Sequence, residues 1–369
     1  MRIVLIVATS TGGVGRHVHD LAEGLVDKGH EVTVTGPPDV LAAFGYAALG
    51  ARVEPLVVSD RPHPRHDVAA IRTLRRLLAG TDVVHAHGLR AGALAVLALG
   101  LGGPPLVVTL HNGPPEGPVA GAIHQALELV VSRGADLVLG VSADLVARMR
   151  RLRARATGLA VVPAAVQPTV TKDRYAVRRE FAAAPRVPLV VTIARLAPQK
   201  GLDVLLDALA QLRATGLEVV SVIAGEGPLA EPLAKRIRSE GLPVRLLGHR
   251  RDVPDLLAAA DVVVSSSRWE GQPVALQEAL HLGAAIVATD AGGTGAVVGD
   301  AAILVPVGDA RSLASALADV LRHGSVRDDL RSKAMARAGE LPTRADAIAA
   351  VLAAYDTVLR DHAGGGPAD

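Results

Sequence analysis

The stretch DVVVSSSRWEGQPVALQEALHLGAAIVATD, residues 261–290, contains the pattern that decides the fold of this chain. It begins with a short apolar run rich in valine, passes through a polar loop into a helical pattern, and ends in a second apolar run. Runs that are apolar throughout, rather than alternating, are typical of parallel strands covered on both faces. A helical segment between two such strands indicates a βαβ unit.

The same alternation of apolar runs and helical patterns continues along the chain in both directions. Helical patterns of roughly ten to fifteen residues separate most of the runs. We therefore expect an α/β protein with two Rossmann-like, doubly wound parallel-sheet domains in series. The expected strands lie at 2–8, 31–36, 53–58, 82–87, 105–111, 136–142, 187–195, 218–225, 244–248, 261–267 and 285–290.

A stretch without a strong strand marks the expected domain boundary. It lies near residues 164–186 and contains Pro168 and Pro185. The predicted domains are residues 1–170 and 171–343. A helix at 344–361 has no strand after it and could pack back onto the first domain, and the tail, 362–369, is expected to be disordered.

The composition excludes several classes of function. Of the 369 residues, 39 are Lys or Arg and 37 are Asp or Glu, and only 2% are aromatic, which argues against nucleic-acid binding. The absence of cysteine excludes disulfides, thiolate metal sites and a cysteine nucleophile. The most apolar long stretch, 91–108, is broken by glycines and prolines before it could span a bilayer. With no signal-peptide pattern at the start, we expect a cytoplasmic enzyme.

The loops that follow the strands are where a ligand site is expected, because ligands of open parallel sheets bind beyond the carboxyl ends of the strands. Two such domains facing each other would enclose a cleft. Gly12, Gly13 and Gly15 follow the first strand and open a helix, so backbone amides there could approach an anion. An ordinary tight turn explains this loop equally well, since it does not match G-x-G-x-x-G.

Histidines end two strands of the first half. His85 and His87 belong to the strand at 82–87, and His111 ends the strand at 105–111. Such a side chain could donate a hydrogen bond to a ligand or transfer a proton, or it could cap the strand end. For His85, inside the strand, the structural role is favoured; for His111 both remain open. No carboxylate nearby completes a ligand set with His85 and His87, so no metal site is expected.

In the second half, cations and glycines follow the strands. Arg195 and Lys200 flank the loop after the first strand of that half, which suits a ligand with two or more negative charges, although solvated loop cations are common. Gly225 and Gly227 form another glycine turn before a helix, a further possible contact for an anion or a base.

The opening stretch adds two carboxylates. Pro273 suits the first helical position, which would place Glu270 on the loop and Glu278 within the helix. A carboxylate only accepts hydrogen bonds, so these two suit sugar hydroxyls, with Glu278 on a ribose and Glu270 on a transferred sugar. Amides of the first helical turn lack intrahelical partners and could hold a phosphate. Those amides belong to Val274, Ala275 and Leu276.

Taken together, these residues resemble the retaining GT-B glycosyltransferases of the large group that includes bacterial mannosyltransferases and sucrose-type synthases. The resemblance runs along nearly the whole chain. Its strongest signature is the E-x7-E pair of Glu270 and Glu278, placed after Arg195 and Lys200. Other matching stretches lie at 12–34, 82–92, 107–112, 140–145, 194–209, 223–229, 246–267 and 283–293.

The resemblance implies a nucleotide-diphosphate sugar donor, UDP- or GDP-linked, bound mainly by the second domain, and an acceptor bound mainly by the first. It implies that Gly13 approaches the diphosphate and that His111 contacts the donor sugar. It places the nucleobase near His249, Arg250 and Val253. It also implies transfer on one face of the sugar, with the leaving phosphate accepting the acceptor's proton. No Asp-x-Asp pair suggests a bridging metal, and no cofactor is expected.

The chain departs from the family pattern at three places. Gln272 and Pro273 stand where Phe-Gly is frequent, PAAV at 163–166 replaces PNGV, and Thr294 stands where many members carry a glutamate. These departures affect the sugar pocket, a turn near the boundary and the contacts of the donor or acceptor.

We expect a retaining, metal-independent hexosyltransferase that acts on a glycan, lipid-linked or small-molecule acceptor, with a role in cell-envelope glycans. The alternatives are a GT-B-fold sugar-nucleotide epimerase and a non-catalytic partner subunit that binds sugar nucleotides. Basic helices could also contact anionic lipid at the inner face of the membrane, although a solvated helix face explains them as well. Their arginines are Arg72, Arg75, Arg76, Arg148, Arg150, Arg151, Arg153 and Arg155.

Overall fold

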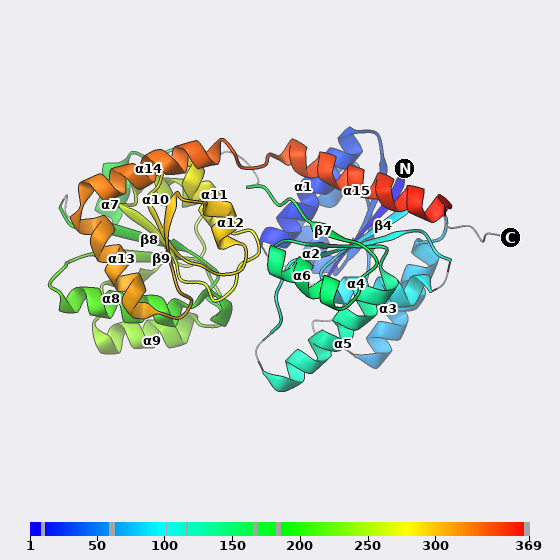
Figure 1. Cartoon of the computed structure of the whole chain (residues 1–369), viewed down its shortest axis with the longest axis horizontal. Helices are drawn as coiled ribbons and strands as arrows, with labels where there is room; N and C mark the ends of the chain where they lie inside the picture. Colours follow the sequence, from blue (N-terminus) through cyan, green and yellow to red (C-terminus); the bar gives the residue numbers. More distant parts are fainter. Residues whose placement is uncertain are drawn as a thin grey trace. The chain divides into compact units, whose positions relative to one another are not determined.

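The computed structural model describes residues 1–8, 12–58, 63–100, 102–115, 117–164, 168–181 and 186–364. The chain divides into two compact units (Figure 1). Unit 1 comprises Met1–Ala165 together with Pro342–Asp369, and unit 2 comprises Val166–Leu341. No helix among the described residues is long and apolar enough to cross a membrane.

Unit 1 contains a sheet of seven parallel strands in the order β3-β2-β1-β4-β5-β6-β7. The central strands are buried along their whole length, which explains why their sequences are continuously apolar. The strands are β1 (Arg2–Val7), β2 (Glu31–Gly36), β3 (Arg52–Pro55), β4 (Val83–His87), β5 (Leu106–Leu110), β6 (Leu137–Gly140) and β7 (Thr157–Leu159).

Helices cover the sheet of unit 1, and one of them comes from the far end of the chain. The C-terminal helix α15 packs against α1 and β5, and its Tyr355 is fully buried there (Figure 1). The helices are α1 (Gly13–Asp27), α2 (Pro38–Phe44), α3 (Pro64–Leu77), α4 (Leu89–Leu99), α5 (Pro118–Gly134), α6 (Ala143–Arg151), α15 (Arg344–Gly364) and the short 3-10 helix η1 (Tyr46–Leu49).

Unit 2 contains a sheet of six parallel strands in the order β10-β9-β8-β11-β12-β13. The strands are β8 (Leu189–Ile193), β9 (Val220–Ala224), β10 (Val244–Leu246), β11 (Val262–Ser265), β12 (Ile286–Thr289) and β13 (Ala302–Val305). The helices are α7 (Arg174–Glu180), η2 (Pro198–Lys200), α8 (Leu202–Ala214), α9 (Ala230–Glu240), α10 (Val253–Ala259), α11 (Val274–His281), α12 (Thr294–Val298), α13 (Ala310–Arg322) and α14 (Gly324–Ala338).

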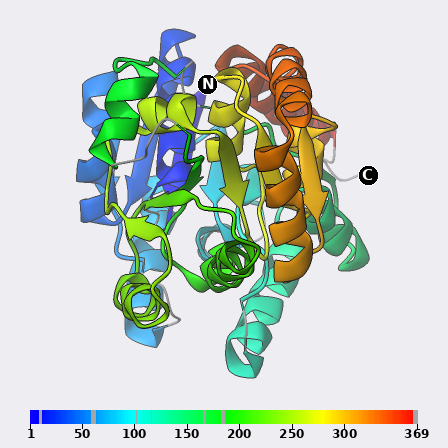
Figure 2. The same cartoon turned by 90° about the vertical axis from the view of Figure 1, so that its left-hand side faces the viewer.

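Helices cover both faces of the sheet of unit 2, as Figure 2 shows from the side of this unit, and an apolar cluster lies on each face. Successive residues of β11 alternate between two apolar clusters. Val262 and Val264 belong to the cluster under α8 and α13, while Val263 belongs to the cluster under α10, α11 and α14. This alternation follows from the period of two along a strand. Valine, leucine and alanine supply nearly all of both clusters, as the low aromatic content predicts.

The structure differs from the predicted elements in four details. The helix expected at 344–361 continues to Gly364, into the tail that was expected to be disordered, and residues 365–369 of that tail lie outside the described residues. The strand expected at 53–58 is β3, Arg52–Pro55, and Val57 beyond it is exposed. The strands β7 and β13, which are three and four residues long and lie at sheet edges, were not predicted. Pro273 is the residue before α11 rather than its first helical residue.

Candidate functional site

In both units some of the predicted site residues lie where the strand order of the sheet reverses, and the others follow strands further along the same sheet. In unit 2 this switch point is between β8 and β11, so the loops after these strands are neighbours. In unit 1 it is between β1 and β4. A topological switch point is the usual ligand site of an open parallel sheet, because the two loops turn away to opposite faces there.

Two of the predicted ligand-binding residues are joined directly in unit 2. Lys200 Nζ donates to Glu270 Oε1 at 2.6 Å, and Ser267 Oγ donates to the same oxygen at 2.5 Å. The Glu270 side chain is only 9% exposed and that of Lys200 is 22% exposed. The carboxylate is therefore fixed in place by two donors, and its other oxygen, Oε2, is not used by these contacts.

Backbone contacts hold the same two loops together. Ser266 Oγ donates to the carbonyl of Lys200 at 3.0 Å. The Arg268 amide donates to the carbonyl of Gln199 at 2.8 Å, and the Gln199 side-chain amide donates to the carbonyl of Trp269 at 2.9 Å. Gly201 permits this approach, because its φ is +55° and a Cβ there would lie 2.1 Å from the carbonyl oxygen of Ser266. The sequence predicted the two cations but not the hydrogen bonds that join these loops.

Arg195 differs from Lys200 in being exposed. Within the part of the chain that the structure describes, its guanidinium makes no ion pair or hydrogen bond. Gly225 lies beside it, since a Cβ on this residue would come within 2.0 Å of the carbonyl oxygen of Ala194. The loop after β9 therefore packs closely against the loop that carries Arg195. Arg195 itself is a cation at the switch point without a partner among the described residues.

The start of α11 supplies fewer amides than expected. The Leu276 amide donates to the carbonyl of Pro273 at 3.0 Å, so it is not available to a ligand in this structure. For the amides of Val274 and Ala275 no acceptor occurs among the described residues. Glu278, in the second turn, is half-buried and has contacts of its own within the chain. Two amides rather than three remain as possible phosphate donors.

Of the three residues expected near a nucleobase, Arg250 is already bound by carboxylates of the chain. The Arg250 guanidinium binds Asp252 at 2.8 Å and Glu180 at 2.6 Å, and these hydrogen bonds raise its pKa. The pKa of Asp252 is lowered, mainly by Arg250. Arg250 therefore joins α7 to the start of α10, and its expected contact with a base would compete with these ion pairs. His249 is exposed, and Val253 is the first residue of α10.

In unit 1 the glycine loop leaves open space above the start of α1. A Cβ added at Gly12 or Gly13 would meet no atom within 4 Å, whereas one at Gly15 would collide with Phe44. Gly12 also has φ +89°, which few residues other than glycine adopt. The first turn of α1 is thus accessible at Gly12 and Gly13 and packed one turn further on.

Four histidine rings gather at the neighbouring switch point of unit 1. His85 and His87 come from β4, His111 follows β5, and His17 comes from α1, which the sequence reasoning did not single out. Burial lowers the pKa of His17 to about 4 and that of His85 to about 3. The pKa values of His87 and His111 are also lowered well below the ordinary value, mainly by burial. All four rings are therefore neutral at neutral pH.

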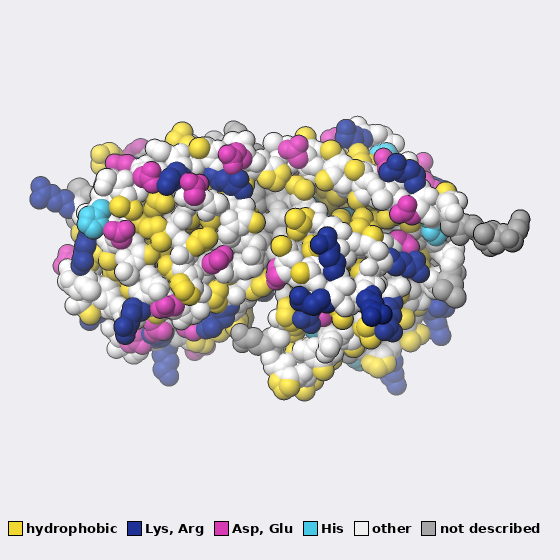
Figure 3. All heavy atoms as spheres, viewed as in Figure 1, with side chains coloured by type: hydrophobic (Ala, Val, Ile, Leu, Met, Phe, Trp, Pro, Cys, Tyr) yellow, Lys and Arg dark blue, Asp and Glu magenta, His cyan; other side chains and the backbone are white. Residues whose placement is uncertain are grey.

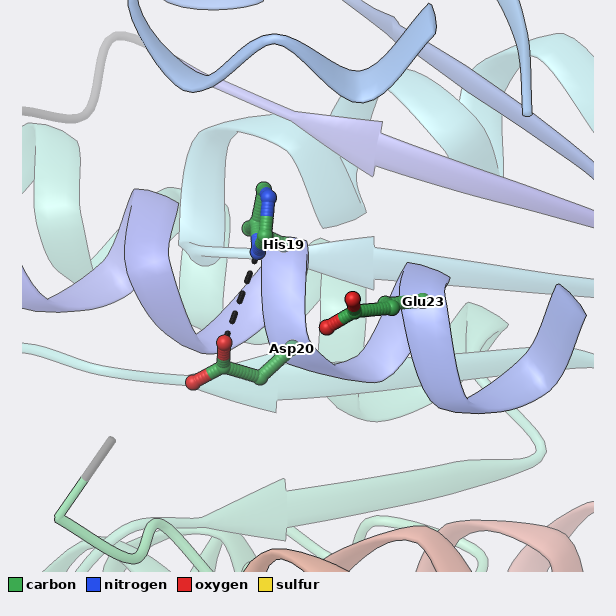
Figure 4. A group of neighbouring side chains, drawn as sticks. All are labelled: His19, Asp20 and Glu23. Carbon is green, nitrogen blue, oxygen red and sulfur yellow. Dashed lines mark hydrogen bonds and ion pairs between the residues drawn. The ribbon is translucent and has the colours of Figure 1, made fainter. Parts of the chain in front are cut away.

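Among the residues that the structure describes, one carboxylate-rich group has ligand atoms close enough for a metal ion. Its members, His19, Asp20 and Glu23, lie on α1 with their ligand atoms within 4.8 Å of one another (Figure 4). Glu23 also pairs with the Arg344 guanidinium at 2.5 Å, and His19 pairs with Asp20 at 3.4 Å. Arg344 thus pairs with one of the two carboxylates and His19 with the other, so each carboxylate has a partner within the chain.

Comparison with known proteins assigns the chain to a family. The family model described as "Glycosyl transferases group 1" matches residues 187–323, and the one described as "Glycosyl transferase 4-like domain" matches residues 12–165. A phosphatidyl-myo-inositol mannosyltransferase of Mycolicibacterium smegmatis is 30% identical over 97% of this chain and 94% of its own length. The chain belongs to the group 1 glycosyltransferases.

Further similar proteins and solved structures support this assignment. A glycogen synthase of Mycobacterium tuberculosis is 29% identical over 84% of this chain and 82% of its own. The Anabaena protein Alr3699/HepE, solved with UDP and glucose, superposes with a TM-score of 0.81 over 97% of this chain and all of that one, at 21% identity. WaaG superposes with a TM-score of 0.72 at 16% identity, over 96% of this chain and 99% of its own. The predicted GT-B fold and glycosyltransferase family are confirmed.

Proposed function

We propose that this glycosyltransferase moves a hexose from a nucleotide-diphosphate donor with retention of the anomeric configuration and without a metal ion. The observation that carries the proposal is the switch point of unit 2. There the exposed cation Arg195, the ion pair of Lys200 with Glu270, and two amides without acceptors come from adjacent loops. A diphosphate is the ligand whose charge and number of acceptor oxygens match this set.

The proposed site would stabilise the charge that develops on the leaving phosphate. Arg195 offers a planar pair of donors, and Lys200 has three donor hydrogens, one of which suffices for Glu270. Lys200 can therefore bind a phosphate oxygen while it keeps the carboxylate in position. Such fixed donors are worth most where the charge appears in the transition state. Their positive charge is also what a metal ion would otherwise supply, and the sequence has no Asp-x-Asp pair to bind one.

The two glutamates would bind sugar hydroxyls. An ionised carboxylate has about four lone-pair positions, and the bonds from Lys200 and Ser267 both end on Oε1 of Glu270. Its second oxygen could accept a hydroxyl of the transferred hexose, and Glu278 would accept ribose hydroxyls. In the proposed reaction the bond from the anomeric carbon to phosphate breaks and the acceptor oxygen bonds on the same face. The acceptor's proton passes to the leaving phosphate.

Unit 1 would bind the acceptor, with Gly13 and His111 in the roles that the family resemblance implies. The names of five of the relatives specify phosphatidyl-myo-inositol as acceptor, so a lipid-linked polyol is the first acceptor to test. Lys and Arg side chains gather over α6 on the face of unit 1 shown in Figure 3. Arg148 is held by Glu128 and Arg75 by carbonyls of α4, so these two serve the fold.

Four exposed arginines of the expected basic clusters have no partner among the described residues, and we propose that they face anionic lipid. They are Arg72, Arg76, Arg151 and Arg153. Vesicle binding that weakens with salt would be the sign of this contact.

The experiment that tests the function is a donor and acceptor screen with purified protein. UDP-, GDP- and ADP-linked hexoses are incubated with phosphatidylinositol vesicles or with the free headgroup, and the product is characterised by NMR. An axial linkage from an axial donor supports retention. An inverted linkage contradicts the mechanism, and interconversion of donor epimers without transfer would assign the chain to an epimerase. Donor binding without transfer or hydrolysis would indicate a non-catalytic subunit.

A further inference from the structure

The buried side chains behind His111 form two hydrogen-bonded groups on one face of the sheet of unit 1, and the contact between the rings of His85 and His87 joins them. His85 and His87 lie two residues apart on β4, so their side chains point to the same face. His85 bonds to Tyr355 of α15 through Nδ1 and to Thr109 of β5 through Nε2, both at 2.8 Å. Its position is thus fixed from two other elements.

His87 lies between His85 and His111. Its ring centroid is 4.1 Å from that of His85 and 5.4 Å from that of His111, and the planes of His87 and His111 are nearly parallel. His17 of α1 packs edge-on against both His87 and His111, at 5.8 and 5.7 Å. These contacts leave the His87 ring, which is 1% exposed, little freedom to rotate.

One hydrogen bond links His87 to the predicted sugar-binding residue. His87 Nδ1 lies 3.2 Å from His111 Nε2. The other nitrogen of His87, Nε2, is buried and has no partner among the described residues. A neutral imidazole carries one proton, and a buried N–H without an acceptor is rarer and more costly than a lone pair without a donor. The proton of His87 therefore belongs on Nδ1, where it can be donated.

We infer that His87 is a positioning residue that donates its Nδ1 proton to His111 Nε2 and so holds His111 as the Nδ1–H tautomer. His111 is half-buried and makes no other hydrogen bond within the described chain, so its Nδ1–H can be offered to a ligand. The chemical class that such a donor recognises is an oxygen acceptor, such as a sugar hydroxyl. This inference rests on the proposed function only in naming the sugar as the ligand.

The tautomer itself can be measured without any substrate. Long-range ¹H–¹⁵N spectra of protein labelled with ¹⁵N-histidine distinguish Nδ1–H from Nε2–H rings, and the His111→Gln variant identifies the His111 signals among the 13 histidines. We expect the Nδ1–H pattern for His111 in the unaltered protein. An Nε2–H pattern there overturns the inference, whatever the variants do.

Substitutions then test whether His87 is the cause. His87→Leu removes the donor, and His111 should revert to Nε2–H; His87→Asn retains an N–H near the same place and should preserve the Nδ1–H form. An unchanged His111 tautomer in a folded His87→Leu protein overturns the inference. As a matched control, Thr35→Val alters another buried side chain of this sheet whose hydroxyl has no partner among the described residues, and it should change nothing.

Kinetics separate this inference from the proposed function. His87→Leu should raise the KM for the donor about tenfold, the effect of roughly one hydrogen bond, with His87→Asn recovering most of it. Equal kinetics in the Leu and Asn variants would reduce His87 to a structural residue. If the unaltered protein transfers no sugar while the tautomer pattern is as expected, the proposed function fails and the positioning role of His87 stands.

Discussion

Replacing Lys200 by methionine tests the proposed site most sharply, because the substitution keeps the length of the side chain and removes its charge. In the structure Lys200 Nζ lies 2.6 Å from Glu270 Oε1, and the glutamate is nearly buried. Breaking a fully buried pair costs about 3–5 kcal/mol, and breaking an exposed pair costs at most about 1. With one partner buried and the other partly exposed, we expect Lys200→Met to lower the unfolding free energy of unit 2 by at most about 2 kcal/mol, because Glu270 keeps its bond from Ser267.

The effect on catalysis should be larger than the effect on stability. Removing one fixed donor to a developing negative charge typically lowers kcat by roughly 100-fold or more, about 3 kcal/mol. Turnover is measured at saturating donor, and urea unfolding of unit 2 is followed through Trp269, the single tryptophan of the chain. A kcat for Lys200→Met within threefold of the unaltered protein would refute the assignment.

The matched variant Glu270→Gln separates a direct role of Lys200 from an indirect one. If Lys200 serves only to hold Glu270, the double variant should lose no more activity than Glu270→Gln alone. If Lys200 also binds the leaving phosphate, the losses should approach addition. A double-mutant cycle on the unfolding free energies provides the control, and we expect a coupling of about 1–2 kcal/mol for a pair in direct contact.

Three further predictions follow from the described contacts. Because the histidine cluster is neutral when folded, with the pKa of His17 at about 4, the unfolded chain binds more protons below pH 6.5. The unfolding free energy of unit 1 should therefore fall towards pH 4, by roughly 1.4 kcal/mol per pH unit for each histidine. Denaturant titrations measure it, and equal unfolding free energies at pH 7 and pH 5 would contradict the prediction. Gly13→Ala should leave the unfolding free energy unchanged, since the added Cβ meets no atom within 4 Å, but it should raise the KM for the donor about tenfold. An unaltered KM would show that the diphosphate does not approach this residue. The fluorescence of Trp269, adjacent to Glu270, should change on titration with UDP or GDP, and the same titration of Lys200→Met should show weaker binding.

Most of the fold could be predicted from the sequence because its signals are local. Continuous apolar runs mark buried parallel strands, and the glycines, cations and histidines that follow them mark the carboxyl edges of the sheets. Strands β7 and β13 were not predicted, although β3 and β10, which are equally short and also lie at sheet edges, were. The hydrogen bond of Leu276 to Pro273 was also missed, because it depends on where α11 begins.

The contacts that could not be predicted join residues far apart in the sequence. Glu180 on α7 binds Arg250, 70 positions away, which ties up a side chain expected at a nucleobase. Tyr355 on α15 bonds to His85 across 270 positions. His17 joins the histidine cluster because it lies one turn into α1, beside the end of β4. Only the three-dimensional fold shows which elements cover a given strand.

The central claim is that the diphosphate of a sugar nucleotide binds at the switch point of unit 2. A crystal structure of the chain with a 2-fluoro analogue of the donor found in the screen tests it directly. We predict phosphate oxygens within hydrogen-bond distance of the Arg195 guanidinium, Lys200 Nζ and the amides of Val274 and Ala275, with Glu270 still bound to Lys200. Phosphates that contact none of these groups would contradict the account.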